Sequence, residues 1–203
     1  MTNQDLIFQL ISQDYLKSAD LKNAFLKADR KNFVPANLQA EAYSDIALPL
    51  FEGQTISQPS TVAFMLDLLE PAKGNKVLEI GAGSGWLTAL LSNLIGRNGF
   101  VFAFEINRKV GEFGIRNLKK HPLKNFQYVI SDAKKHWRDG APYDRIISGA
   151  AFSEINEDFF RLLSNNGTAV IPTKQNSICK IYKNNKGDIS TLTFPGFLFV
   201  PLI

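Results

Sequence analysis

The sequence has a single cysteine, Cys179, among its 203 residues, so no disulfide can form within the chain. This excludes the disulfide-stapled scaffolds of small secreted proteins. The two histidines, His121 and His136, lie far apart in polar stretches, and no group of His, Cys and Asp has the spacing of a metal site. We therefore expect no metal, surface positions for both histidines, and a packing role for Cys179.

Long apolar runs are also missing. No stretch approaches the roughly 18 apolar residues of a membrane span, and the first residues lack the basic and apolar regions of a secretory signal. The net charge is +4, but the densest basic clusters are only Lys119-Lys120 and Lys134-Lys135. This pattern favours a solvated surface over a nucleic-acid-binding face. We expect a cytoplasmic protein that is a monomer, with neither a membrane nor a nucleic acid as partner.

The 45% hydrophobic composition is typical of one compact domain. We expect a single domain over residues 1–203 in three parts. Residues 1–75 supply N-terminal helices and an active-site loop, 76–175 a ligand-binding core, and 176–203 a C-terminal hairpin. In the first part, apolar spacing predicts helices over 6–11 and 21–28, the second capped by Ser18, and a third that opens at Pro59.

Residues 36–59 contain few helix signals and include Pro49, Gly53 and Pro59. A loop of this length inside a compact domain is usually functional. Its apolar residues predict that it packs against the core; these residues are Ile46, Leu48, Leu50 and Phe51.

Strands and helices alternate from residue 76 onward. Apolar segments predict strands over 77–80, 100–105, 126–130, 143–148 and 168–171, with helices over 87–95, 110–118 and 157–163. Segments 177–182 and 189–194 flank a turn and predict an antiparallel hairpin. The fold class is therefore α/β: a mostly parallel, doubly wound, Rossmann-like sheet with helices on both faces and an antiparallel C-terminal edge.

A glycine-rich turn joins the first strand of this core to its helix, with the sequence Glu79-Ile80-Gly81-Ala82-Gly83-Ser84-Gly85-Trp86. The dinucleotide fingerprint requires a glycine at position 86, where this chain has tryptophan. The spacing E-x-G-x-G-x-G is instead typical of S-adenosylmethionine-dependent methyltransferases.

The same turn predicts how the methionine end of S-adenosylmethionine binds. Glycines allow the backbone to approach a ligand closely, which assigns this contact to Gly81, Ala82, Gly83 and Gly85. We expect Glu79 to bind the ammonium group, directly or through water. The alternative is a tight turn without a ligand.

Two further acids end strands of the core. Glu105 lies about 20 residues after the glycines, where a carboxylate accepts ribose hydroxyls in nucleoside-binding α/β domains. Asp132, followed by Ala133, lies where an adenine amino group would be bound. The alternatives are a surface acid for Glu105 and a helix N-cap for Asp132.

Several segments together resemble the protein-L-isoaspartate (D-aspartate) O-methyltransferase family. They are residues 29–35 (DRKNFVP), 43–50 (YSDIALPL), 53–59 (GQTISQP), the glycine turn, 170–172 (VIP) and 199–202 (FVPL). The GQTIS segment is the most specific of them, and the resemblance covers nearly the whole chain. The chain differs from the family pattern at Phe51, Ser60 and Phe152, among other positions, and we expect these three to line the substrate cleft.

The resemblance implies methyl transfer from S-adenosylmethionine to the side-chain carboxylate of L-isoaspartyl or D-aspartyl residues in damaged proteins. It implies that Ser57 is catalytic and orients the acceptor, and that Ile56 and Ser57 also contact the cofactor. It further implies a substrate-binding set of Gln54, Thr55, Val200, Pro201 and Leu202.

Two other functions stay open at this point. One is a methyltransferase of the same fold with a small-molecule acceptor, and the other is a non-catalytic S-adenosylmethionine-binding protein. An open groove beside Ser57 would favour a peptide acceptor, whereas a closed pocket would favour a small one.

Overall fold

The computed structural model describes residues 1–203, and its main feature is a seven-stranded sheet in the order β5-β4-β3-β6-β7-β8-β9. Neighbouring strands from β5 to β7 are parallel, and β8 and β9 are antiparallel. The strands are β3 (Lys76–Ile80), β4 (Phe100–Glu105), β5 (Phe126–Ile130), β6 (Tyr143–Ser148), β7 (Leu163–Thr173), β8 (Ser177–Lys183) and β9 (Ile189–Pro195). The predicted α/β fold with an antiparallel C-terminal edge is confirmed.

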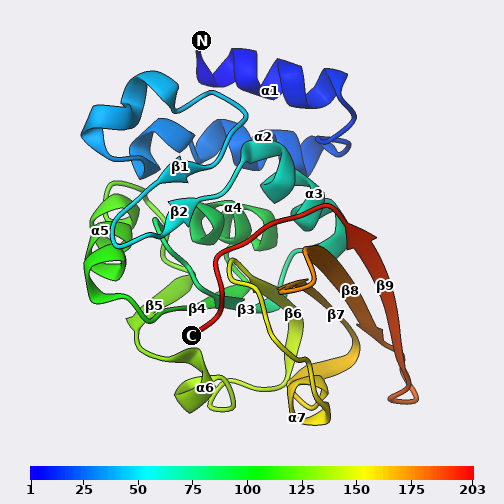
Figure 1. The fold of residues 1–203 in the computed structure, drawn as a ribbon. Helices are drawn as coiled ribbons and strands as arrows, with labels where there is room; N and C mark the ends of the chain where they lie inside the picture. The colour runs from blue at the N-terminus through cyan, green and yellow to red at the C-terminus, as the bar shows by residue number, and fades with distance from the viewer.

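Helices cover both faces of the sheet, with α1, α2 and α4 above it and α6 and α7 below it in Figure 1. Alternate strand residues enter two apolar cores: Val77 joins the larger cluster and Leu78 the smaller one. The helices are α1 (Asn3–Ser12), α2 (Ala19–Lys27), α3 (Pro59–Leu69), α4 (Trp86–Ile95), α5 (Arg108–Leu118), α6 (Ala133–His136) and α7 (Glu157–Phe160). None of these helices is long and apolar enough to cross a membrane.

The N-terminal helices form because their ends are capped and their apolar faces are buried. Ser18 caps α2 as predicted, since its side chain accepts a hydrogen bond from the backbone N–H of Leu21. Helix α2 packs on the core helix α4 through Phe25. The Phe25 ring lies edge-on to the Trp86 ring, with the ring centroids 5.5 Å apart. The Trp86 indole N–H donates to the Ala28 carbonyl, so Trp86 packs the first part of the chain onto the core.

The segment between α2 and α3 has little regular structure. It contains two 3₁₀ helices, η1 (Arg30–Phe33) and η2 (Ala36–Glu41), and a small antiparallel hairpin of β1 (Leu48–Pro49) and β2 (Thr55–Ile56). Leu48 and Ile56 face each other and are buried, so the expected packing is found there. Ile46 is exposed, and the prediction was wrong for this residue.

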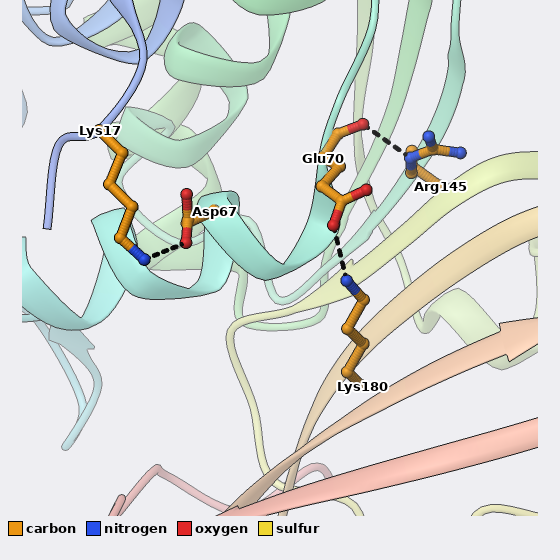
Figure 2. Close-up of polar contacts among 5 residues, drawn as sticks. All are labelled: Lys17, Asp67, Glu70, Arg145 and Lys180. Carbon is orange, nitrogen blue, oxygen red and sulfur yellow. Dashed lines mark hydrogen bonds and ion pairs between the residues drawn. The ribbon is translucent and has the colours of Figure 1, made fainter.

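Polar contacts join the end of helix α3 to neighbouring elements (Figure 2). Lys17 pairs with Asp67 at 2.9 Å, and Lys180 of β8 pairs with Glu70 at 2.8 Å. The Arg145 guanidinium donates to the Glu70 carbonyl. Exposed ion pairs contribute little stability, so these contacts add only weakly to the packing of α3.

Two local predictions were wrong. The helix expected over 157–163 is only the four-residue α7, and Leu163 already belongs to β7. His121 is half-buried rather than a surface residue, because its ring stacks on Phe33 with centroids 4.9 Å apart. Burial lowers the pKa of His121. The burial of His121 depends on Phe33, which is distant in the sequence.

Candidate active site

Three adjoining cavities lie where the glycine turn meets the β1–β2 hairpin and the C-terminal segment. Thr55 lines all three, Gly81 and Gly83 line the first two, and Ser57 lines the second and third. The shared lining residues make the cavities direct neighbours at the carboxyl ends of the parallel strands, where ligands bind in such sheets.

The glycine turn has the conformation that its sequence predicts. Gly81, Gly83 and Gly85 have φ angles of 74°, 56° and 83°, a region that residues with side chains rarely adopt. The amides of Gly81 and Ala82 both donate to the Phe104 carbonyl, at 2.8 and 3.0 Å. Gly81, Ala82 and Gly83 line the cavities. Gly85 does not line them and is instead the N-cap of α4.

Glu105 ends β4 and lines the first cavity, although only 6% of the residue is exposed. One carboxylate oxygen accepts from the Gly83 amide at 2.9 Å and the other from the Asn107 amide at 2.8 Å. Burial raises the pKa of Glu105, and these backbone hydrogen bonds oppose the rise. A carboxylate oxygen can accept more than one hydrogen bond, so both oxygens of Glu105 can still accept from ligand hydroxyls.

Glu79 is fully buried beneath the turn and lines none of the three cavities. One of its oxygens accepts from the Thr88 hydroxyl of α4 at 2.7 Å, and the other has no hydrogen-bond partner. Burial raises the pKa of Glu79 to about 8, so the group is mostly protonated at neutral pH. An unpartnered buried oxygen is costly, which marks this group as one that a ligand or water could satisfy.

The glycine turn is supported from its far side by residues that the sequence analysis did not single out. The Tyr128 hydroxyl of β5 donates to the Gly83 carbonyl at 2.7 Å. The Asn117 side-chain amide of α5 donates to the Ser84 carbonyl at 3.1 Å. A Cβ atom on Gly114 would lie 2.5 Å from the Gly83 oxygen. A glycine inside a helix costs stability, and this cost is the sequence signal that could have revealed Gly114.

Asp132 and Ala133 line the first cavity beside Glu105. Asp132 is also the N-cap of α6, because its carboxylate accepts from the Lys134 amide at 2.9 Å. The capping alternative for Asp132 is therefore confirmed, while its contact with adenine stays a prediction.

The predicted acceptor residues come together on the other side of the site. Gln54 and Thr55 line the first cavity, Ile56 and Ser57 the second, and Ser57 also the third. Val200, Pro201 and Leu202 close the first cavity from the C-terminal segment, which Figure 1 shows in red crossing in front of the sheet. Hydrogen bonds of 2.8 Å join Ala151 to Val200 and to Leu202 and hold this segment in place.

Ser57 does not cap α3. The N-cap of this helix is Gln58, without a side-chain capping bond, and the Asp45 carboxylate accepts from the Ser60 amide at 2.8 Å. The alternative that Ser57 is only a helix cap is therefore wrong.

The cavity lining does not include Phe51, Ser60 or Phe152, so the expectation that these residues line the cleft was wrong. Phe51 lies at the hairpin tip and packs against Phe113 of α5 with ring centroids 5.3 Å apart. Ser60 is buried in the first turn of α3, and Phe152 packs on Phe159 in the smaller core.

The charges of the site are few and all negative. Glu105 and Asp132 are the only charged side chains among the lining residues, and both belong to the first cavity. The third cavity is lined by uncharged residues, which are Ala47, Thr55, Ser57, Gln58, Thr61, Gly149 and the segment 196–200.

The residues present fit S-adenosylmethionine. The first cavity combines the Glu105 carboxylate with apolar walls that suit a nucleoside, among them Ile80, Phe104 and Ile106. The buried, unpartnered oxygen of Glu79 lies in the strand that leads into the turn, where an ammonium group would satisfy it directly or through water.

Two solved structures share this fold. A crystal structure from Plasmodium falciparum, assigned as a protein-L-isoaspartate O-methyltransferase in complex with S-adenosyl-L-homocysteine, has a TM-score of 0.89 and 23% identity over 100% of this chain and 99% of that one. A second solved protein-L-isoaspartate O-methyltransferase has a TM-score of 0.80 and 26% identity, and covers 96% of this chain and 65% of that one.

Sequence relatives agree with the structural ones. A protein-L-isoaspartate O-methyltransferase from Ignicoccus hospitalis is 36% identical over 98% of this chain and 96% of its own length, and one from Methanopyrus kandleri is 37% identical over 98% and 89%. The family model described as Protein-L-isoaspartate(D-aspartate) O-methyltransferase matches residues 1–203. The resemblance found in the sequence is confirmed: the chain belongs to the protein-L-isoaspartate(D-aspartate) O-methyltransferase family.

Proposed function

We propose that this chain transfers the methyl group of S-adenosylmethionine to the side-chain carboxylate of L-isoaspartyl or D-aspartyl residues in damaged proteins, which begins their repair. The observation that carries the proposal is the uncharged cavity beside Ser57, which shares Thr55 and Ser57 with the second cavity, at the glycine turn. The segment 196–200 that lines it offers backbone groups along which an extended peptide could lie.

The donor supplies a sulfonium-bound methyl group when it is bound. Glu105 accepts hydrogen bonds from the ribose hydroxyls, and Asp132 and Ala133 border the adenine. Gly81, Ala82 and Gly83 contact the methionine end, and Glu79 acts on its ammonium group directly or through water.

The acceptor needs no general base, because a carboxylate with a pKa near 4 is already ionised at neutral pH. No lysine, arginine or histidine lines the three cavities, so no protein cation pairs with the acceptor and lowers its nucleophilicity. The Ser57 hydroxyl donates a hydrogen bond that orients the carboxylate towards the donor. Catalysis then consists mainly of alignment and of excluding water.

The β1–β2 hairpin forms part of the walls that align the acceptor with the donor. Ile56 is buried and lines the second cavity, while Gln54 and Thr55 cover the first. Val200, Pro201 and Leu202 border the same space and form an edge along which a peptide backbone lies. Both halves of the site come from one chain, so we propose that the enzyme works as a monomer. Its single free cysteine fits a reducing compartment, and we propose that this is the cytoplasm.

The test is transfer of labelled methyl groups to an isoaspartyl peptide, with the aspartyl peptide of the same sequence as control. We expect base-labile labelling of the isoaspartyl peptide alone. Equal labelling of both peptides, or of neither, would contradict the proposed substrate.

A further inference from the structure

Arg30 is the largest fully buried side chain in the molecule, and it opens the 3₁₀ helix η1. Burial lowers the pKa of its guanidinium to about 10, and the nearby Asp45 charge opposes this change. No carboxylate forms a direct ion pair with it; its hydrogen bonds all go to backbone carbonyls. A buried charge is costly, and such a group is retained when it organises several partners at once.

The carbonyls that Arg30 binds belong to both arms of the loop that leads to the acceptor site. One terminal nitrogen, Nη1, donates to Ala42 and Ser44 at 2.9 and 3.2 Å. The other, Nη2, donates to Ile46 at 2.9 Å and to Ser57 at 3.0 Å, with a longer contact of 3.5 Å to Ile56. One side chain therefore joins residues 42–46 to residues 56–57 across the hairpin.

The same guanidinium also reaches the cofactor half of the site. Its central carbon lies 5.3 Å from the centre of the Trp86 ring, and Trp86 follows the glycine turn and lines the second cavity. Arg30 is therefore placed between the backbone of Ser57 and the helix that begins at the cofactor loop.

We propose that Arg30 is a positioning residue for methyl transfer: its guanidinium holds the Ser57 backbone in register with the glycine turn, so that the Ser57 hydroxyl faces the donor. The proposal rests on the role given to Ser57 above. Arg30 touches no reacting atom, and it lines none of the three cavities.

Backbone pairing alone is too sparse to fix this loop. The hairpin has only two residue pairs, Leu48 with Ile56 and Pro49 with Thr55, and Ser57 lies beyond them. A planar guanidinium presents donors in a rigid fork, and this geometry lets one group reach carbonyls on two chain segments. A lysine ammonium is a point charge and cannot span the same set.

The experiment compares Arg30→Lys with the wild-type enzyme in single-turnover methyl transfer to the isoaspartyl peptide, well below both melting temperatures. We expect the transfer rate to fall roughly ten- to a hundredfold, since small misplacements of reacting groups have effects of this size. Affinity for S-adenosylhomocysteine should change by less than about threefold, because Glu105 and the glycine turn are held by hydrogen bonds that do not involve Arg30.

Leu10→Ala is the matched control, because it removes a buried side chain of α1 that lines none of the three cavities. It should lower the melting temperature and leave the single-turnover rate unchanged. A normal rate in Arg30→Lys, or an equal loss of rate in both variants, would overturn the positioning role.

Chemical rescue is a second measurement that distinguishes a positioning role from a purely structural one. In Arg30→Ala, millimolar guanidinium should restore part of the transfer rate, whereas the same concentration of sodium chloride should not. Absence of rescue in a variant that is folded by circular dichroism would count against the proposal. An inactive wild-type enzyme would overturn the proposed function together with this role, whereas an active wild type with an unimpaired Arg30→Lys would overturn the role of Arg30 alone.

Discussion

The two halves of the active site are held in different ways. In the cofactor half, the glycine turn is held by close backbone contacts as well as side chains: the amides of Gly81 and Ala82 donate to the Phe104 carbonyl of the adjacent strand, and Gly114 leaves no room for a side chain beside Gly83. In the acceptor half, the loop 42–57 is fixed mainly by bonds from charged side chains to backbone groups. Arg30, from outside the loop, donates to its carbonyls, and Asp45, within the loop, accepts from the Ser60 amide at the start of α3.

This difference determines what would damage each half. The cofactor half is crowded at its backbone, so an added methyl group should disturb it. The acceptor half depends on single donors and acceptors, so the loss of one polar group should disturb it. Cofactor affinity and transfer rate should therefore respond to different substitutions.

The largest effect is expected for Gly114→Ala in α5. The new Cβ would lie 2.5 Å from the Gly83 oxygen and 2.7 Å from the Tyr128 hydroxyl, so the turn must move. Overpacking of this kind costs roughly 1–3 kcal/mol. We expect a loss of stability and, in calorimetry, an affinity for S-adenosylhomocysteine lowered by up to about a hundredfold.

The control for Gly114→Ala is Gly74→Ala. Gly74 has a φ of 87° and open space around it, so this substitution is strained without touching the turn. It should lower the melting temperature and leave the affinity unchanged. Equal affinities in both variants would show that the turn does not depend on its packing against α5.

Ser57→Ala tests the acceptor half. A hydrogen bond to a charged group contributes roughly 1.5–3 kcal/mol, which corresponds to a ten- to hundredfold lower single-turnover rate. Melting temperature and cofactor affinity should stay close to those of the wild type, because Ser57 does not cap α3. The control is Ser60→Ala, which removes a nearby hydroxyl that lines no cavity; a similar rate loss there would argue against a specific role for Ser57.

Glu105→Gln tests the cofactor half by removing a charge rather than by adding a methyl group. The amide keeps the shape of the side chain but removes the charge and one acceptor. We expect binding of S-adenosylhomocysteine to weaken by roughly 1.5–3 kcal/mol in calorimetry. Glu112→Gln, an exposed change on the neighbouring helix α5, should bind normally, and unchanged affinity in Glu105→Gln would remove the residue from the site.

The same contrast explains what the sequence could predict. Glu79, the three glycines and Glu105 form a local pattern whose spacing follows from a strand, a turn and a helix, so these positions were predictable. The core strands were predictable from their apolar runs, since burial on both faces leaves a clear signal.

The supports of the site were less visible in the sequence. Tyr128 and Asn117 reach the glycine turn from positions more than 30 residues away, and neither residue type indicates this role. Phe51 and Phe152 differ from the family pattern and suggested a changed cleft, but packing turns both away from it. Position in the sequence cannot decide the direction of a side chain in an irregular loop.

A smaller, measurable effect concerns the proton on Glu79. With a pKa of about 8, this carboxyl is mostly protonated at pH 7. A bound ammonium group favours the carboxylate, so cofactor binding should lower the pKa and release up to about one proton. Calorimetry in buffers of different ionisation enthalpy measures this release, which Glu79→Gln should abolish.

The same group gives a stability test with a defined sign. Because the pKa of Glu79 is raised from 4.5 in the unfolded chain, the folded state holds the extra proton, and its contribution to stability falls as the pH rises from about 4.5 to about 8. Wild type should therefore lose stability relative to Glu79→Gln across this window. A constant difference, or binding without proton release, would mean that Glu79 ionises normally or does not respond to the ligand.

The smallest effect is expected at the hairpin tip, where the two halves touch. Phe51 packs on Phe113, Lys109 lies 5.3 Å from the centre of the Phe51 ring, and Glu52 accepts from the Asn107 side chain. An aromatic contact contributes roughly 0.5–1.5 kcal/mol, so Phe51→Ala should speed cofactor dissociation by about two- to tenfold. The single-turnover rate at saturating cofactor should not change, because the ring lines no cavity. Stopped-flow displacement measures the dissociation rate, and Phe8→Ala, an exposed change on α1, is the control. A slower methyl transfer with normal dissociation would instead place Phe51 among the supports of the acceptor half.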